Sequence, residues 1–347
     1  MFEAIQPALP CDPARVDDFL GEPPDAVVGM VQRTGGDFMV LGAGGKMGLH
    51  LCLMLRKAVQ KAGVGGRVTA VSRFGSVHDR DLFERGGVVT QACDLCNPEE
   101  LAALAPAENV VFMAGAKFGT SGQPDLLRRM NVEMPERVAH HFRNSRVTAF
   151  STGCVYSFVP VDSPGSSEGS ETAPVGDYAR SCLGREQAFT RSAREFQTRL
   201  ALIRLNYSVE FRYGVLVDIA TRVLKGEPVD VSCGHVNVIW QRDAVAQTLL
   251  AHEHASPAPF VINIAGSEIL RVRDLAKRFG DILGREPVFT SKEAPTAWLS
   301  DSSLARQLFG PPETSVDEMI SWIAAWLRRG QPTHGKPTGF EKRDGNF

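Results

Sequence analysis

The sequence predicts an α/β fold: a doubly wound parallel sheet of Rossmann type with a smaller C-terminal substrate-binding lobe. A short apolar run, Phe38-Met39-Val40-Leu41, leads directly into a glycine-rich turn and a helix. Short apolar runs and helical stretches then alternate as far as Leu205. This alternation implies a parallel sheet with helices on both faces. After Asn206 the alternation becomes irregular, which indicates a separate, loop-rich lobe.

The apolar periodicity assigns the elements in order. Buried strands are expected over 38–41, 67–71, 88–92, 109–113, 147–150 and 201–205. The helices of this part are expected over 46–62, 79–85, 98–104, 125–144 and 178–196. In the second half, helices are expected over 215–225, 242–251, 271–283 and 315–329, and short strands over 229–232, 236–239 and 260–264.

These elements predict four parts of the chain. They are an N-terminal arm (1–36), a dinucleotide-binding Rossmann domain (37–206, to which 236–262 returns), a substrate-binding lobe (207–235 and 263–330) and a C-terminal tail (331–347).

Composition excludes several classes of protein. The 347 residues suffice for about two domains, and 38 basic against 40 acidic residues give a net charge of −2. No basic stripe is present for a phosphate backbone, so we expect no nucleic-acid partner. No apolar run reaches the roughly 18 residues of a membrane span, and the first residues do not resemble a secretory signal. Seven scattered cysteines, an odd number, favour a reducing compartment, so we expect a cytoplasmic protein.

The glycine-rich turn after the first strand predicts a dinucleotide site. Its residues are Gly42, Gly44, Gly45, Lys46, Met47 and Gly48, and a helix follows them. In this context the glycines allow a tight turn and a close approach of the backbone to a pyrophosphate, which sits at the helix N-terminus. The alternative is a glycine-rich turn that binds nothing.

The end of the second strand bears on the choice of cofactor. Where an NAD site usually offers a carboxylate to the ribose, this chain has Ser72 and Arg73. A hydroxyl and a cation suit the additional phosphate of NADP, so NADP is favoured over NAD. The alternative is that Arg73 is a solvated loop residue.

The spacing Gly42-x-x-Gly45-x-x-Gly48 resembles the extended short-chain dehydrogenase/reductase superfamily, also described as the NAD-dependent epimerase/dehydratase family. Further segments resemble the motifs of that family in the same order, over roughly residues 38–330. The resemblance implies further cofactor contacts at Asp94 and Leu95 (adenine), at Ala114 and Gly115 (beneath the nicotinamide half) and at the helix residue Asn131.

The resemblance also implies the catalytic residues. Thr152 matches the hydroxyl that holds the reacting oxygen, and Tyr178 matches the tyrosine that exchanges a proton with the substrate while hydride moves to or from the nicotinamide. Where the family has Tyr-x-x-x-Lys, this chain has Cys182 in place of the lysine. A free tyrosine has a pKa of about 10 and needs a nearby cation to act as a base, and a neutral thiol supplies none.

Three interpretations of this departure stay open. Lys117 or Arg185, together with the charge of the nicotinamide, compensates for the missing lysine. Alternatively, Tyr178 acts mainly as an acid, or the chain binds its cofactor with little or no turnover. Lys117 follows the fourth strand, at the sheet edge where ligands bind. Its alternative role is that of a surface lysine.

A second departure concerns the substrate. Relatives that act on nucleotide sugars hold the diphosphate with an arginine at the position that is Val236 here. We therefore expect a small sugar, sugar acid or polyol as the substrate, and not a nucleotide-diphosphate sugar. Asn206 and Arg212 are the candidate substrate residues. Arg212 could pair with a carboxylate, and an ion pair within the protein is the alternative.

Together these features predict an NAD(P)-dependent oxidoreductase of the extended short-chain type. A cofactor-recycling epimerase or dehydratase, and a non-catalytic sensor or scaffold, are the alternatives. The resemblance implies a homodimer. No metal is expected, because Cys93 and Cys96 have the spacing of a metal pair but lack a second pair.

Overall fold

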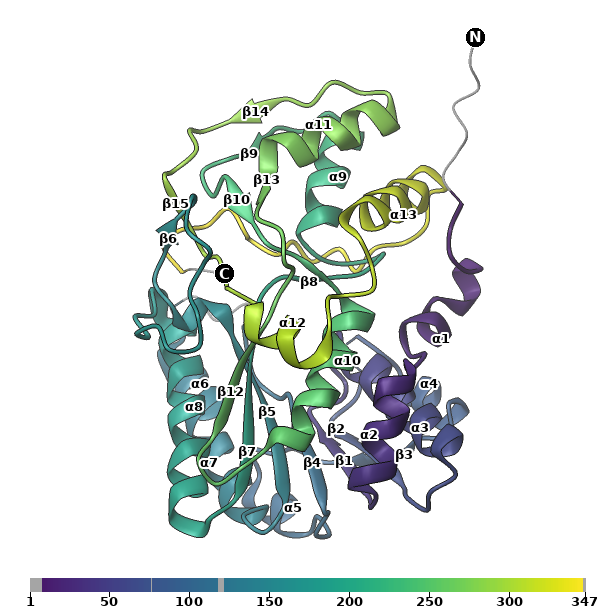
Figure 1. Cartoon of the computed structure of the whole chain (residues 1–347), viewed down its shortest axis with the longest axis vertical. Coiled ribbons are helices and arrows are strands. Elements are labelled where there is room, and N and C mark those ends of the chain that lie inside the picture. Colours follow the sequence, from purple (N-terminus) through teal and green to yellow (C-terminus); the bar gives the residue numbers. More distant parts are fainter. Residues whose placement is uncertain (1–7, 76, 118–121, 346–347) are drawn as a thin grey trace.

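The computed structural model describes residues 8–75, 77–117 and 122–345, so the first seven residues of the predicted arm and the last two of the tail lie outside it. Its centre is a seven-stranded sheet in the order β12-β7-β5-β4-β1-β2-β3 (Figure 1). All neighbouring strands are parallel, and the order reverses between β1 and β4, which confirms the doubly wound Rossmann-type fold. The strands are β1 (Phe38–Leu41), β2 (Val68–Ser72), β3 (Val89–Ala92), β4 (Asn109–Phe112), β5 (Arg146–Thr152), β7 (Arg199–Leu205) and β12 (Phe260–Ile264).

Helices cover both faces of this sheet, and β1 shows why. Phe38 and Val40 point into one hydrophobic layer, whereas Met39 and Leu41 point into the other, because successive strand residues face opposite sides. The first layer contains α2 (Asp25–Thr34), α3 (Gly48–Ala62), α4 (Arg80–Arg85) and α10 (Gln241–Ala251). The second contains α5 (Pro98–Ala102), α7 (Met134–His141) and α8 (Gly176–Phe196).

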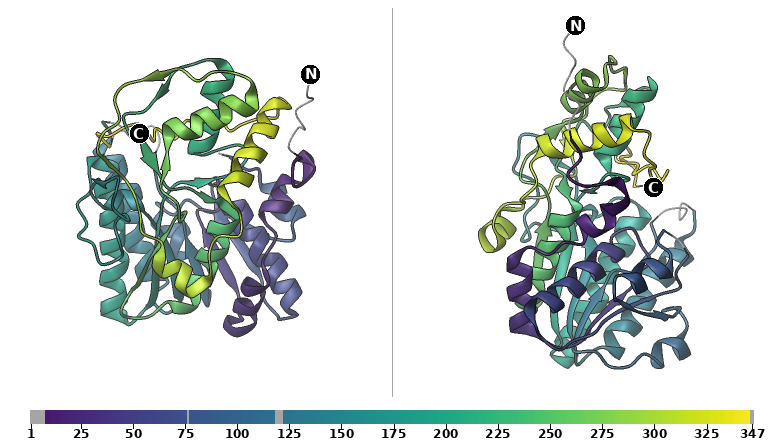
Figure 2. Two further views of the ribbon diagram at one scale, coloured as in Figure 1. Left: turned by 45° about the horizontal axis from the view of Figure 1, so that its top comes forward. Right: turned by 90° about the vertical axis from the view of Figure 1, so that its right-hand side faces the viewer.

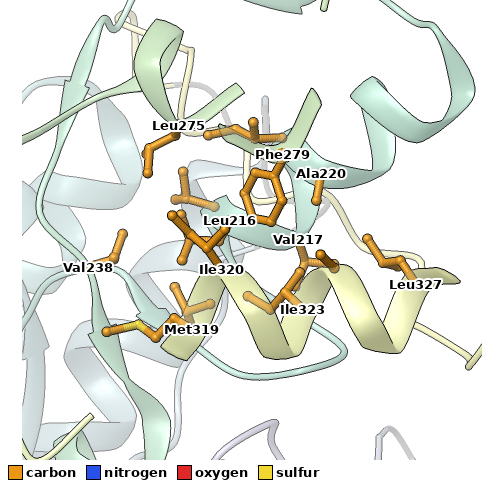
Figure 3. Packing of buried hydrophobic residues seen from close by; sticks show 14 of the residues in the cluster. Leu216, Val217, Ala220, Val238, Leu275, Phe279, Met319, Ile320, Ile323 and Leu327 are labelled. Atoms are coloured by element: carbon orange, nitrogen blue, oxygen red, sulfur yellow. The ribbon is translucent and has the colours of Figure 1, made fainter. Parts of the chain in front are cut away.

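A smaller lobe lies over the carboxyl ends of the strands (Figure 2). Its core is formed by α9 (Val215–Lys225), α11 (Val272–Leu283) and α13 (Val316–Arg328), whose apolar side chains meet around Phe279 and Ile320 (Figure 3). Short strand pairs surround this core: β8 (Ser208–Val209) with β11 (Ile239–Trp240), β9 (Val229–Asp230) with β14 (Phe289–Thr290), β10 (His235–Val236) with β13 (Leu270–Arg271), and β6 (Val159–Pro160) with β15 (Thr296–Ala297).

Two predicted elements are divided in the structure. The helix expected over 125–144 consists of α6 (Pro124–Arg128), a π-helical turn, η2 (Arg129–Glu133), and α7. The strand expected over 236–239 is wrong as one unit, because β10 and β11 have different partners. The sequence analysis also missed α12 (Ser303–Phe309) and the two-residue strands β6, β8, β13, β14 and β15, which are too short to show a periodicity.

The arm connects the lobe to α3. Val16 and Leu20 of α1 (Val16–Leu20) lie in the lobe core, while Asp17 bonds to His50 of α3 at 2.8 Å. The domain boundaries drawn from the sequence stay predictions. In the described part of the chain, no helix has the length and apolarity needed to cross a membrane.

Candidate active site

A cavity of about 610 Å³, here called the pocket, opens at the carboxyl ends of β1, β4, β5 and β7. Ligands of open α/β sheets bind at this edge. The predicted site residues that line it are Gly42, Gly45, Lys46, Met47, Arg73, Gly115, Lys117, Thr152, Tyr178 and Asn206. The described lining does not include the other predicted residues, which are Gly44, Gly48, Ser72, Asp94, Leu95, Ala114, Asn131, Cys182 and Arg212.

The glycine-rich turn has the shape of a dinucleotide cradle. Gly42 has a φ of +83°, and a Cβ there would lie 2.5 Å from Ala114 Cα. A Cβ at Gly48, where α3 begins, would overlap the carbonyl oxygen of Ala43. Gly45 is exposed toward the pocket, where a Cβ would meet nothing closer than Gly42 O at 3.6 Å. The turn therefore leaves room for a pyrophosphate beside the N-terminus of α3, so the residues present fit a bound dinucleotide.

The wall at the end of β2 is positively charged. Arg73 lines the pocket, and Ser72 Oγ accepts a hydrogen bond of 3.2 Å from the Phe74 N–H. A Cβ added to Gly44 would lie only 2.5 Å from this Oγ, so the turn and β2 are in close contact. Ser72 thus supports the turn, and Arg73 offers its charge to the pocket.

The segment after β3 is held by its own contacts. The Asp94 carboxylate accepts from the Cys96 N–H at 3.0 Å, and the Asp94 N–H donates to Glu100 at 2.7 Å. Leu95 is buried in the sheet layer. Within the described residues, no group of three or more His, Cys, Asp or Glu side chains is placed to hold a metal.

Asn131 fixes the segment that leads to Lys117. It lies in the π-helical turn η2, fully buried, and forms two hydrogen bonds of 2.9 Å with the backbone N–H and carbonyl of Ala116. Its amide nitrogen also donates to Ser181 Oγ at 2.9 Å, and its oxygen accepts from Arg185 at 2.7 Å. Because Ser181 and Arg185 lie on α8, Asn131 holds the β4 loop against the helix that carries Tyr178.

Tyr178 and Thr152 lie where the resemblance implies. Tyr178 enters the pocket from the first turn of α8, and Thr152 enters it from the end of β5. Cys182, one helical turn further on, is fully buried outside the described lining and shares a hydrogen bond with Tyr178. Burial raises the pKa of Tyr178 well above its ordinary value, and the neighbouring Cys182 and Cys154 raise it further. The tyrosine is therefore a protonated phenol at neutral pH.

Two cations lie near this phenol. Lys117 Nζ is 5.6 Å from the centroid of the Tyr178 ring, and burial lowers the pKa of this lysine. The guanidinium of Arg185 donates to Phe150 O at 3.1 Å, and its charge acts to lower the pKa of Tyr178. Positive charge is thus present near the tyrosine although Cys182 provides none.

The two predicted substrate residues differ in their surroundings. Asn206 lines the pocket, and its amide nitrogen donates to Asn237 Oδ1 at 2.8 Å. Arg212 lies outside the described lining and forms ion pairs of 2.8 Å with Asp17 and 3.2 Å with Glu210. Its charge is already matched by two carboxylates within the protein.

The sequence analysis missed several lining residues from the lobe and the tail. Tyr207 lies between β7 and β8, and Tyr213 lies between β8 and α9. Lys336 and Thr338 come from the C-terminal tail. Tyr207 has a φ of +44°, a backbone strain of the kind that concentrates at functional sites. No local motif marks the tail residues, because only tertiary packing brings them here.

The pocket carries a concentration of positive charge. Lys46, Arg73, Lys117 and Lys336 line it, and no carboxylate does so in the part of the chain that the structure describes. Lys46 Nζ lies 3.6 Å from the centroid of the Tyr213 ring. Burial, followed by the charges of Lys117 and Lys336, lowers the pKa of Lys46 to about 7. Such a lining suits a ligand with several negative charges.

Comparisons with known proteins agree with this geometry. The model of the family described as "NAD dependent epimerase/dehydratase family" matches residues 38–265. No curated protein matches the chain.

Three solved structures illustrate the likeness of fold. The UDP-glucose 4-epimerase of Thermotoga maritima, solved with UDP-glucose, has a TM-score of 0.69 at 18% identity, with 85% of this chain and 99% of that chain covered. The UDP-glucuronic acid 4-epimerase of Bacillus cereus, solved with NAD, has a TM-score of 0.68 at 18% identity, with 84% and 99% covered. MoeE5, solved with UDP-glucose and NAD, has a TM-score of 0.67 at 20% identity, with 85% and 99% covered.

These neighbours correct the expectation of a substrate without a nucleotide diphosphate. Proteins of this fold that match the chain over nearly their whole length are solved with UDP-glucose. The expectation rested on Val236, and the structure shows why that was unsound. Val236 is fully buried in the lobe core and pairs with Leu270 in a strand, so it reports nothing about a phosphate in the pocket.

Proposed function

The chain belongs to the NAD dependent epimerase/dehydratase family, and from this membership we propose that it is an NAD-dependent epimerase of a nucleoside diphosphate sugar. The observation that carries the proposal is the pocket itself. It joins the glycine cradle, the pair Thr152 and Tyr178, and a cationic lining that contains no carboxylate among the described residues. A diphosphate sugar offers the matching negative charge together with hydroxyl groups for the two catalytic side chains.

The dinucleotide would be held at the turn Gly42–Gly48 and along Arg73. When bound, it supplies a reversible acceptor for hydride from the reacting carbon of the sugar. The backbone of the turn would orient the pyrophosphate, and Asn131 would keep the wall at Ala116 in place through its two bonds of 2.9 Å.

Tyr178 and Thr152 would handle the substrate oxygen. Tyr178, as the phenolate, would accept the proton of the sugar hydroxyl, and Thr152 Oγ1 would hold the same oxygen. Tyr178 would later return the proton to that oxygen, which would restore the starting state of the chain. Because burial raises the pKa of Tyr178, the proton-accepting form depends on the nearby charges of Lys117 and Arg185.

The cofactor preference belongs to this proposal. Neighbouring proteins were solved with NAD. Arg73 supplies a cation at the end of β2, where the described lining holds no carboxylate, and this supports acceptance of NADP as well. The homodimer and the cytoplasmic location stay predictions. Light scattering, which measures the molar mass in solution, tests whether the chain forms a homodimer.

The test uses the purified chain with NAD and either UDP-glucose or UDP-glucuronic acid. Proton NMR of the anomeric region should show the epimer accumulating, without stoichiometric formation of NADH at 340 nm. Tyr178→Phe should lower the rate at least about a hundredfold, as loss of a general acid–base group does, while UDP still binds. A wild-type chain that binds neither UDP-sugar, or a Tyr178→Phe variant with full turnover, would overturn the proposal.

A further inference from the structure

The C-terminal tail is fastened to the lobe at several points. We call residues 331–345 the strap, and within these described residues it forms no helix or strand. Trp326 Nε1 donates to Pro332 O at 2.9 Å, and the His334 N–H donates to Arg212 O at 3.0 Å. Further along, Phe340 is only 1% exposed, so the strap is packed into the lobe.

The middle of the strap is held to α9. The backbone N–H and the hydroxyl of Thr338 both donate to Asp218 Oδ2, at 2.7 and 2.6 Å. Three residues later, Glu341 pairs with Arg222 at 2.9 Å. Since Asp218 and Arg222 both lie on α9, this helix fixes the strap on either side of its buried residue.

The far end of the strap crosses to the helix that carries Tyr178. Arg343 donates to the carbonyl and to the hydroxyl of Thr296, both at 2.6 Å, and its guanidinium lies 4.1 Å from the centroid of the Phe158 ring. Gly345 then packs against Gly176, where a Cβ would lie 2.6 Å from Gly345 Cα. Gly176 is the first residue of α8, so the strap runs from the end of α13 to the start of α8, as the yellow chain in Figure 1 shows.

Between these anchors, Lys336 lines the pocket. It faces the same cavity as Lys46 of the glycine turn and Lys117 of the β4 loop. These lysines come from three distant parts of the chain. The charges of Lys117 and Lys336 act to lower the pKa of Lys46, and Asp218 of α9 offsets only part of this effect. A bound polyanion would offset all three.

We propose that Lys336 binds the diphosphate of the substrate, which makes the strap a part of the substrate site. This rests on the proposed function. Lys336 belongs to the lobe side of the pocket, because Thr338, two residues further on, is bonded to Asp218 of α9. The dinucleotide pyrophosphate is expected at the glycine turn, where Lys46 lies close enough to Lys336 for the two charges to interact. A lysine ammonium is a compact charge that suits a phosphate group.

The test compares Lys336→Ala with Lys342→Ala, which removes the same charge from an exposed position of the strap. Calorimetric titration with UDP, in the presence of saturating NAD, should give a dissociation constant about 10- to 100-fold weaker for Lys336→Ala and unchanged for Lys342→Ala. Lys336→Arg should restore most of the affinity. The dissociation constant for NAD should be the same in all variants, and thermal melting verifies that each is folded.

Each other outcome has a definite meaning. If Lys336→Ala lowers the affinities for NAD and UDP equally, the proposal is overturned, since Lys336 would then serve the cofactor. Unchanged UDP binding in Lys336→Ala would overturn it as well. If the wild-type chain binds no UDP, the proposed substrate class fails, and titration with inorganic pyrophosphate at saturating NAD decides the role of Lys336 separately. Loss of pyrophosphate binding in Lys336→Ala alone supports an anion site at this lysine, and equal or absent binding in wild type and variant refutes it.

Discussion

The ammonium group of Lys117 lies 5.6 Å from the centroid of the Tyr178 ring, within the range over which a cation interacts with an aromatic face. The two residues come from different elements, the loop after β4 and the first turn of α8, and Asn131 connects those elements. In the family pattern, a lysine one turn after the tyrosine supplies this charge. Here a lysine from the loop after β4 lies near the tyrosine ring instead.

Lys117→Met should therefore impair catalysis more than binding. We expect kcat to fall about a hundredfold. The rise of the rate with pH, which follows ionisation of the Tyr178 phenol, should move to higher pH because a nearby cation favours the phenolate. Steady-state kinetics between pH 6 and 10 measure both effects. Lys117→Arg should recover part of the rate. Lys225→Met, at an exposed lysine at the end of α9, serves as the control, and an equal loss there would refute this role of Lys117.

Arg73→Ala should alter the choice of cofactor. Arg73 lines the pocket just after β2, and its guanidinium would meet the additional phosphate of NADP if NADP binds as proposed. Its loss should then lower the affinity for NADP about tenfold or more and leave the affinity for NAD nearly unchanged. Fluorescence titration with both reduced cofactors gives the ratio. Arg67→Ala, at the exposed start of the same strand region, should change neither constant. Equal weakening of NAD and NADP by Arg73→Ala would show that the residue does not discriminate.

Dinucleotide affinity should depend on pH through Lys46. Its pKa is about 7 in the ligand-free chain, and a bound anion raises that pKa because it favours the ammonium form. The added affinity is then complete below pH 7 and is lost as the pH rises through the higher pKa of the complex. NAD titrations between pH 6 and 9 should show this decline. Lys46→Arg should flatten it, since arginine stays charged throughout. A decline of the same size in Lys46→Arg would assign the effect to another group.

Glu186→Ala should destabilise the fold. Glu186 and Arg204 form a buried ion pair at 2.8 Å between α8 and β7, and Ser151 Oγ donates to the same carboxylate at 2.6 Å. Removal of one partner leaves a buried guanidinium unpaired, which costs about 3–5 kcal/mol. Urea unfolding measures the loss. Glu195→Ala, at an exposed position of the same helix, should change the unfolding free energy by less than about 0.5 kcal/mol.

The sheet and the cradle were predictable because local sequence specifies them. The apolar run Phe38–Leu41 and the glycines after it determine a strand, a turn and a helix within a short stretch of chain. Thr152 and Tyr178 could be identified because each sits in a motif with fixed spacing. Both line the pocket, although their catalytic roles stay part of the proposal.

The charge of the pocket could not be predicted in the same way. Lys336 is brought to the pocket by contacts such as Thr338 with Asp218, which are 120 residues apart in sequence. Val236 was misleading for the related reason that a residue type, without its position, does not reveal whether a side chain faces a ligand or a core. A motif predicts the structure of its own short segment, whereas the pocket is completed by residues that are distant in sequence.

The π-helical turn η2 makes the active-site wall sensitive to chain length as well as to composition. Such a turn holds one residue more than an α-helical turn, so it acts as a single-residue insertion between α6 and α7. Deleting one residue there would restore a continuous helix and rotate one side against the other by about 100°. Asn131 would then face away from Ala116 and Ser181 even though every residue type in the wall were kept. The position of Lys117 therefore depends on a count of residues in a helix to which it does not belong.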